Sequence, residues 1–235
     1  MPTSADHQVN GIPAPLSRRE LLGTALIGGI SLTGLIAGCA PNDREPTAPI
    51  EEDGTTMPTG PNRKTLLAYF SRAGENYHDG GRRFLDAGNT EVLAELISGR
   101  IDCDVYRINP ADPYPDSYDL TVARNVREQE DDARPAIAGP LPDIGRYGTI
   151  LLGSPVWNVR APMIMSTFVE SLDLTGRTIL PFVTYAVSGI GDVERDYRDM
   201  LPDTEIRTGL AVRGETVANA GPEVDAWLTE QRMNR

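Results

Sequence analysis

Hydrophobic and polar positions follow two alternating patterns after residue 63. Short apolar runs, which are typical of buried strands, alternate with segments whose apolar residues recur at helical spacing. The expected strands cover residues 65–71, 103–110, 148–155, 178–185 and 204–214. The expected helices cover residues 89–101, 116–133, 161–172, 192–201 and 222–233. We expect Asn89 to cap the first helix, whereas Pro181 is unfavourable in a central strand because it lacks an N–H donor.

This alternation predicts an α/β fold in three layers, a doubly wound parallel sheet of five strands with helices on both faces. We expect the strand order 2-1-3-4-5. In such sheets a ligand binds outside the carboxyl ends of the strands, where the order reverses between the first and third strand. The loops that follow these strands are therefore the candidate functional segments.

Residues 1–39 have the features of an export signal. Arg18 and Arg19 precede an uncharged apolar run at 21–38 that is rich in small residues, and Cys39 follows it. The arginine pair resembles the twin-arginine signal class. The segment IAGC at 36–39 resembles the lipobox of bacterial lipoproteins, in which the cysteine is lipidated. An uncleaved N-terminal anchor helix is the alternative, and both interpretations predict a protein on the extracytoplasmic side of the cytoplasmic membrane.

Residues 40–62 contain five prolines and little apolar periodicity, so we expect a disordered linker there. Residues 63–235 then form the folded domain. The formal net charge of −12 argues against a nucleic-acid partner and suits docking to a basic protein. The two cysteines are too few for a disulfide framework.

Three loops at the expected ligand edge are rich in Gly, Ser, Thr and Asn. They are residues 71–76 joined to 88–90, residues 154–158, and residues 184–191. The first turn of a helix offers unpaired backbone N–H groups and a partial positive charge, which suits a phosphate. The side chains of Ser71, Asn89 and Thr90 add donors. Ordinary turn chemistry explains each loop taken alone, but all three converge on one edge of the sheet.

Six segments occur in a fixed order between about residues 64 and 232: AYFSRAG, GNTEVLAELI, INPADPYPDSYD, REQEDDARPAI, LLGSPVWNVRAPMIMSTFVESLDLTGRTILPF and TYAVSGIGDV. Together they resemble the flavodoxin-like proteins that bind FMN. The resemblance implies contacts to the FMN phosphate from Ser71, Arg72, Ala73, Asn89 and Thr90. It also implies contacts to the isoalloxazine ring from Pro155, Val156, Trp157 and Asn158, and from the loop Thr184–Gly189, which includes Thr184, Ser188 and Gly189.

Trp157 follows a buried strand directly, in a segment expected to be a loop. By the same resemblance it stacks on the flavin ring, which stabilises the oxidised ring and helps to set its reduction potential. The alternative is a core position beneath the third helix. Trp227, on the last helix, is expected in the core.

The chain departs from the flavodoxin pattern at residues 75–87, which separate the two halves of the phosphate loop. The site closes if this insertion loops out, since long surface loops cost little entropy. The insertion is then a lid, a docking surface for a redox partner or a tolerated surface loop. Arg82 and Arg83 could add positive charge near the phosphate.

No hydrolase elbow, zinc-protease motif, C-x-x-C pair or P-loop occurs, and no catalytic residue or metal site is expected. The sequence therefore predicts a membrane-tethered FMN-binding redox protein. It serves either electron transfer to a redox partner protein or NAD(P)H/quinone-type oxidoreduction of a small quinone-like or nicotinamide substrate. The alternative is a flavin-free lipoprotein that keeps the fold and acts as a binding module.

Overall fold

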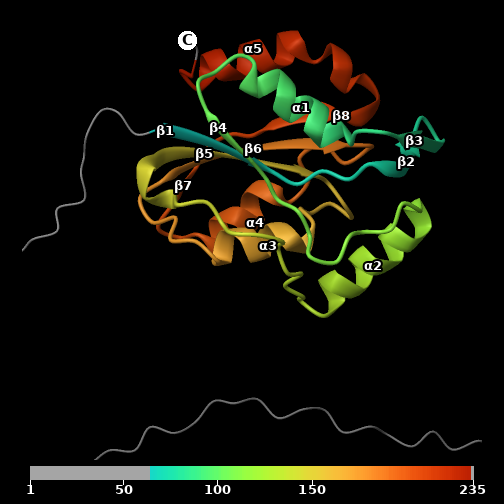
Figure 1. Cartoon of the computed structure of the whole chain (residues 1–235). Helices are drawn as coiled ribbons and strands as arrows, with labels where there is room; N and C mark the ends of the chain where they lie inside the picture. Colours follow the sequence, from blue (N-terminus) through green and yellow to red (C-terminus); the bar gives the residue numbers. More distant parts are fainter. Residues whose placement is uncertain (1–63, 234–235) are drawn as a thin grey trace, which may run out of the picture. The chain divides into compact units, whose positions relative to one another are not determined.

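The computed structural model describes residues 64–233 (Figure 1). The predicted signal at 1–39 with Cys39 and the predicted linker at 40–62 lie outside the described residues. The strands are β1 (Lys64–Tyr69), β2 (Gly74–His78), β3 (Gly81–Leu85), β4 (Asp104–Arg107), β5 (Tyr147–Pro155), β6 (Thr178–Tyr185), β7 (Glu205–Ile206) and β8 (Leu210–Arg213). The helices are α1 (Asn89–Ser98), α2 (Tyr118–Glu130), η1 (Ile144–Arg146), α3 (Met163–Glu170), α4 (Val193–Met200), η2 (Gly214–Asn219) and α5 (Gly221–Glu230).

The main sheet has the order β4-β1-β5-β6-β7, and β8 also pairs with β6. Every pairing in this sheet is parallel. The strands β4, β1, β5 and β6 are the second, first, third and fourth expected strands, and β7 and β8 together take the place of the fifth. The predicted α/β class and the order 2-1-3-4-5 are therefore confirmed.

The prediction of one continuous strand at 204–214 was wrong, because residues 207–209 leave the ladder between β7 and β8. Arg207 N donates to Ile179 O of β6, so the next β6 residue that faces this edge is Pro181. Pro181 has no N–H to donate, and Gly209 lies close against its carbonyl oxygen. Pairing resumes where Phe182 meets Leu210.

Two apolar cores lie on opposite faces of the sheet, since successive strand residues point to opposite sides. Leu66 and Ala68 of β1 belong to the core that α3 and α4 cover, whereas Leu67 and Tyr69 belong to the core under α1 and α5. Figure 1 shows these two helix pairs on either side of the sheet. Trp227 is buried in the second core, as expected, and its Nε1 donates to Thr208 O (3.0 Å).

The insertion at 75–87 folds as an antiparallel hairpin of β2 and β3. Asp79 and Gly80 form its turn, and both have positive φ (45° and 84°), as a type I′ turn requires. At the base of the hairpin, Glu75 N donates to Asp116 O (2.8 Å) and Glu75 Oε2 accepts from Tyr118 N (3.0 Å). The insertion is thus an ordered element joined to the start of α2.

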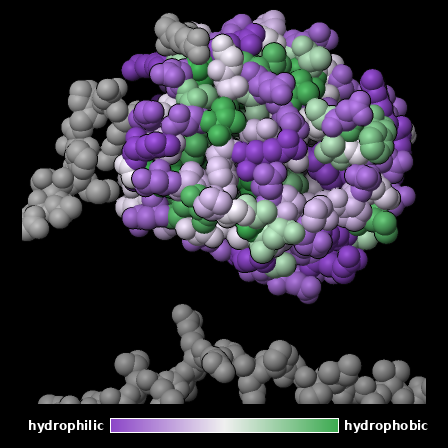
Figure 2. All heavy atoms as spheres, viewed as in Figure 1, coloured by the Kyte–Doolittle hydropathy of each residue, from purple (hydrophilic) through white to green (hydrophobic). Residues whose placement is uncertain are grey.

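Among residues 64–233, no helix is long and apolar enough to cross a membrane. Within the same range, no group of three His, Cys, Asp or Glu side chains is arranged to hold a metal ion. On the face shown in Figure 2, hydrophilic residues predominate and hydrophobic residues are scattered between them.

Candidate functional site

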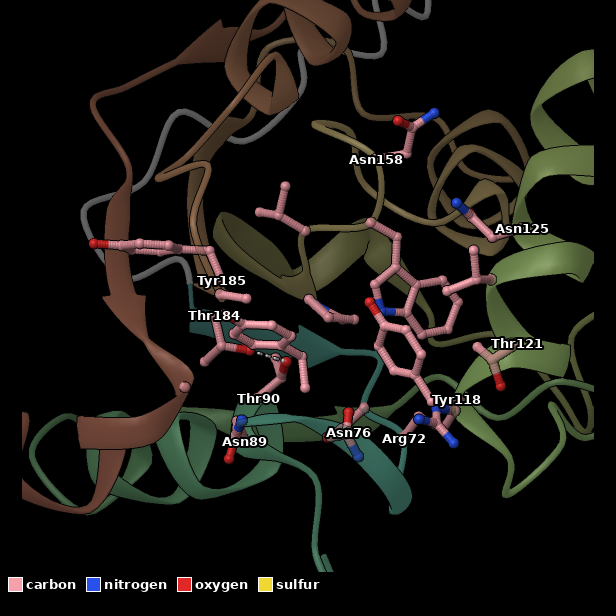
Figure 3. A pocket seen from close by; sticks show the side chains of 18 of the residues that line it. Arg72, Asn76, Asn89, Thr90, Tyr118, Thr121, Asn125, Asn158, Thr184 and Tyr185 are labelled. Carbon is pink, nitrogen blue, oxygen red and sulfur yellow. Dashed lines mark hydrogen bonds between the residues drawn. The ribbon is translucent and has the colours of Figure 1, made fainter. Parts of the chain in front are cut away.

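A cavity of about 340 Å³ lies at the carboxyl ends of β1, β5 and β6 (Figure 3). Nine of the predicted site residues line it: Ser71, Arg72, Asn89, Thr90, Pro155, Val156, Trp157, Asn158 and Thr184. Ala73, Ser188 and Gly189 are not among its lining residues. The cavity therefore occupies the edge where the strand order reverses.

One end of the cavity, which we call the phosphate end, is formed by Ser71, Asn89 and Thr90. The β2–β3 hairpin is inserted between the two halves of the phosphate loop. The two halves are still in contact, because Glu91 N donates to Ser71 Oγ (3.1 Å). The helix α1 has ten residues, and the first-turn amides of Asn89 and Thr90 have no acceptor within the helix. This end therefore presents backbone N–H groups and hydroxyls together.

Asn89 does not cap α1 as predicted. Gly88 is the N-cap and makes no side-chain cap bond, and the first-turn amide of Glu91 donates to Ser71 Oγ instead. A side chain at 88 would collide with Ser71 and with the carbonyl of Arg72, so glycine allows the two loop halves to pack together. Asn89 instead begins the helix, and its amide group lies against Gly214.

The hydroxyls of Thr90 and Thr184 form a hydrogen bond with each other across the floor of the cavity (2.7 Å; Figure 3). Thr90 is the second residue of α1 and Thr184 lies near the end of β6, so the bond joins two elements far apart in the sequence. Both side chains are almost fully buried. A buried pair of this kind fixes the distance between the helix and the strand that carry the site.

The guanidinium of Arg72 is used mainly for structure. Its Nη1 donates to the carbonyl oxygens of Pro115 (2.9 Å) and Asp116 (3.1 Å), and its Nη2 donates to that of Glu75. Burial lowers the pKa of Arg72, and its Nε has no partner within residues 64–233. Arg72 therefore ties the hairpin to the loop before α2.

Trp157 lies at the other end of the cavity, which we call the ring end, within a tight turn. Trp157 N donates to Arg160 O (2.9 Å) and Arg160 N donates to Trp157 O (3.2 Å). The indole makes edge contacts with Phe70 (5.6 Å between centroids, 89°) and Tyr114 (5.2 Å, 74°). Trp157 packs partly against the first core and also lines the cavity. These contacts hold the indole in one orientation.

The helix α2 holds this turn in place. Gln129 Nε2 donates to Trp157 O (3.1 Å), and Gln129 Oε1 accepts from Asn158 Nδ2 (2.8 Å). Arg160 also pairs with Asp196 of α4 (2.6 Å). The turn is thus fixed from both sides by side chains of two helices.

One face of α2 also lines the cavity, although the sequence did not predict site residues there. The residues are Tyr118, Thr121, Val122, Asn125 and Val126. Their spacing of three and four residues places them on one helix face, so the periodicity alone could have identified them. The sequence predicts residues 116–133 only as a polar helix with a modest apolar stripe.

The hairpin supplies a further wall through Asn76 and Tyr77. Arg82 pairs with Asp119 (3.0 Å) and lies over the ring of Tyr118 (3.7 Å to the centroid), and neither Arg82 nor Arg83 lines the cavity. The suggestion that these two arginines add charge at the phosphate therefore has no support from their position.

Glu215 places a carboxylate on the cavity wall near the phosphate end. Its Oε1 accepts from Asp79 N at the hairpin tip (3.3 Å), and its Oε2 lies 3.4 Å from Arg213 Nε. Burial opposes its ionisation, but these backbone N–H and arginine contacts outweigh burial and lower the pKa of Glu215. Arg213 offsets the negative charge that Glu215 brings to this end.

The fold and the cavity define a flavodoxin-like α/β protein, and comparisons with known proteins agree. A family model described as Flavodoxin matches residues 82–231. A protein of Bacteroides eggerthii, provisionally described as a flavoprotein, is 31% identical, with 72% of this chain and 98% of that chain covered and a TM-score of 0.58. A second such protein, from Bacteroides uniformis, is 30% identical, with 72% and 99% covered and a TM-score of 0.58. The chain belongs to the flavodoxin family.

A flavoprotein of Lactobacillus acidophilus solved in complex with FMN is 20% identical, with 70% of this chain and 98% of that chain covered and a TM-score of 0.51. At this identity the likeness concerns the fold. No curated protein matches the chain.

Proposed function

We propose that this chain binds FMN without a covalent bond in the cavity and works as a redox protein. The observation that carries the proposal is a cavity with a phosphate end and an aromatic ring end, at the reversal point of the sheet in a member of the flavodoxin family. Bound flavin would supply hydride and electron transfer, and the protein would bind, orient and tune it. The Lactobacillus acidophilus flavoprotein, which has this fold, contains FMN.

The phosphate end supports this proposal through its donors. The first-turn amides of α1 and the hydroxyls of Ser71 and Thr90 suit a dianionic phosphate. A phosphate here is held mainly by helix and loop groups, since most of the Arg72 guanidinium is committed elsewhere.

The ring end supports the proposal of FMN binding because its walls are flat and largely apolar. Trp157 and Tyr118 provide aromatic surface, and Val122 and Val126 provide aliphatic surface. An indole already held by two aromatic neighbours loses little conformational freedom when it contacts a planar heterocycle. None of these side chains needs to act as an acid or a base.

Two activities fit this site: electron transfer between proteins, and two-electron transfer from a nicotinamide donor to a quinone-like acceptor. The net charge of −12 suits a basic protein partner. The sequence features of residues 1–39 support a further part of the proposal, a lipid anchor at Cys39 on the outer face of the cytoplasmic membrane.

A flavin-free binding module is the second candidate. The carboxylate of Glu215 favours it, because a negative charge on the cavity wall repels a phosphate. Its pairing with Arg213 reduces that repulsion, so FMN binding remains the stronger proposal.

A visible absorption spectrum distinguishes the two candidates. The full-length chain is produced with FMN present, purified and desalted. A retained yellow band, with FMN released on denaturation, is the expected result. A folded, colourless protein that takes up no added FMN would favour the binding module.

A further inference from the structure

The β2–β3 hairpin is an ordered part of the chain to which the proposed function gives no role. Its two strands pair in a fixed register, in which Tyr77 of β2 lies directly opposite Arg82 of β3. Residues that lie directly opposite each other point to the same face of an antiparallel pair. Tyr77 lines the cavity, so Arg82 belongs to a face of the hairpin that meets the site.

Arg82 does not line the cavity itself, but it covers a residue that does. Its guanidinium carbon lies 3.7 Å from the centre of the Tyr118 ring, which is the geometry of a cation–π interaction. Tyr118 lines the cavity, and Figure 3 shows its side chain pointing into the cavity from the start of α2. Because Arg82 is not a lining residue, the guanidinium lies behind the ring as seen from the cavity.

Two further contacts hold this stack of guanidinium and ring. Arg82 Nη2 pairs with Asp119 Oδ1 (3.0 Å), which keeps the guanidinium over the ring. Tyr118 N donates to Glu75 Oε2 (3.0 Å), which fixes the backbone that carries the ring to the base of the hairpin. The side chain of Asp119 is 82% exposed and that of Arg82 is 40% exposed, so water screens the carboxylate more than the guanidinium. The ring end of the cavity therefore experiences mainly the positive charge of this pair.

We propose that Arg82 is a positioning residue for the flavin: it holds the Tyr118 ring against the isoalloxazine ring and places a positive charge behind it. This inference rests on the proposed FMN binding. Reduction adds electrons to a flavin ring, so a nearby cation stabilises the reduced ring more than the oxidised ring. Arg82 therefore strengthens FMN binding and raises the midpoint potential, and the hairpin is the element that tunes the cofactor.

The other arginine of β3 provides the matched control. Arg83 is the next residue and has the same charge, but successive strand residues point to opposite faces. Its Nη1 lies 3.1 Å from Nε2 of His78, and His78 does not line the cavity. An effect that depends on the Tyr118 ring should therefore be confined to Arg82.

The test uses the full-length chain as Arg82→Gln, Arg82→Lys and Arg83→Gln. The affinity for FMN and the midpoint potential are measured for each protein, and thermal unfolding of the apoprotein checks that each variant folds. In Arg82→Gln, FMN binding should weaken by about two- to fivefold, the contribution of one exposed cation–π contact. Its midpoint potential should become more negative, because the affinity for reduced FMN falls further. Arg82→Lys keeps the cation and should retain most of the wild-type potential, and Arg83→Gln should change neither quantity.

A second variant tests whether Arg82 acts through the ring. Tyr118→Leu removes the ring, so it should weaken FMN binding by itself. When Arg82→Gln is added to Tyr118→Leu, the further loss of affinity should largely disappear. A double-mutant cycle of these two changes measures their coupling directly.

An unchanged affinity and an unchanged midpoint potential in Arg82→Gln would overturn the inference while leaving FMN binding in place. Equal changes in Arg83→Gln would also overturn it, because the effect would then come from the charge of the hairpin as a whole. Fully additive losses of affinity in the double-mutant cycle would show that Arg82 does not act through Tyr118, and would overturn it as well. A wild-type protein that takes up no FMN would instead overturn the proposed function, and this inference with it.

Discussion

Among single residues, Val159 has the least favourable backbone conformation at the site. Asn158 and Val159 both have positive φ (51° and 62°), and Asn tolerates this region whereas a β-branched residue does not. Hydrogen bonds hold this backbone conformation in place. They join Gln129 to Trp157 and Asn158 of the turn, and Asp192 N to Val159 O (2.7 Å). The surroundings therefore impose the conformation of the turn that carries Trp157.

Val159→Gly should raise the free energy of unfolding by up to about 1 kcal/mol, because relief of about 1–2 kcal/mol of left-handed strain exceeds the entropy cost of glycine, about 0.5–1 kcal/mol. Chemical denaturation measures this change in the free energy of unfolding. Val187→Gly is the matched control, since Val187 is 81% exposed and does not have positive φ. The control should lose stability, and an equal loss in both variants would show that Val159 is not strained.

Trp157→Ala should weaken FMN binding by about tenfold or more, because stacking of aromatic rings contributes about 0.5–1.5 kcal/mol beyond the apolar area that the indole buries. Fluorescence titration with FMN measures the affinity, and Trp157→Phe should retain most of it. Thermal unfolding of the apoprotein reports separately on the lost contacts with Phe70 and Tyr114. Identical affinity and midpoint potential in Trp157→Ala would exclude contact with the flavin.

Among the elements, the β2–β3 hairpin depends on few contacts at its tip. Asp79 N donates to Glu215 Oε1, and Asp79 also pairs with Arg213 (3.5 Å). Glu215→Ala should free the tip, because it removes the acceptor of that N–H. Hydrogen exchange at residues 76–84 and FMN release should both become faster, since Asn76 and Tyr77 line the cavity. Glu205→Ala, which breaks an exposed pair with Arg207, is the control.

The hydrogen bond from Asp79 N to Glu215 also predicts that the stability of the hairpin tip depends on pH. The pKa of Glu215 is below its ordinary value of 4.5 in the folded protein, so its ionised form stabilises the fold above about that pH. This stabilisation is lost as the pH falls through the folded-state pKa. Hairpin exchange, corrected for the intrinsic rate, should increase upon acidification below about pH 4.5 in the wild type. In Glu215→Ala it should be fast throughout, and an acid-induced increase there would assign the effect to another group.

The periodicity of the chain was sufficient to predict most elements, because a parallel sheet buries both faces and its strands are continuous apolar runs. The strand at 178–185 was predicted with the bounds that the structure has. The fifth strand was not, since its interruption depends on Pro181 in a neighbouring strand. The face of α2 that lines the cavity was missed although its residues recur at helical spacing, because spacing does not reveal which element a helix face meets.

For the whole molecule, the proposed cofactor and the proposed location constrain each other. A noncovalent flavin that is loaded in the cytoplasm reaches the outer face only if the protein crosses the membrane folded, which the twin-arginine route allows. Arg18→Lys with Arg19→Lys preserves the charge, yet it should leave the flavin-loaded protein in the cytoplasm. Arg207→Lys with Arg232→Lys, a conservative pair on the domain surface, should be exported normally.

The variant Cys39→Ser tests the proposed lipid anchor independently of the twin-arginine export route. It should shift the exported protein from the membrane fraction to the soluble extracytoplasmic fraction without changing its flavin spectrum, because the residues that line the cavity begin at Ser71. Cell fractionation, with the yellow band as the readout, follows both sets of variants. Normal export of the double lysine variant with its flavin would contradict the twin-arginine route, and the cofactor would then have to be loaded outside the cytoplasm.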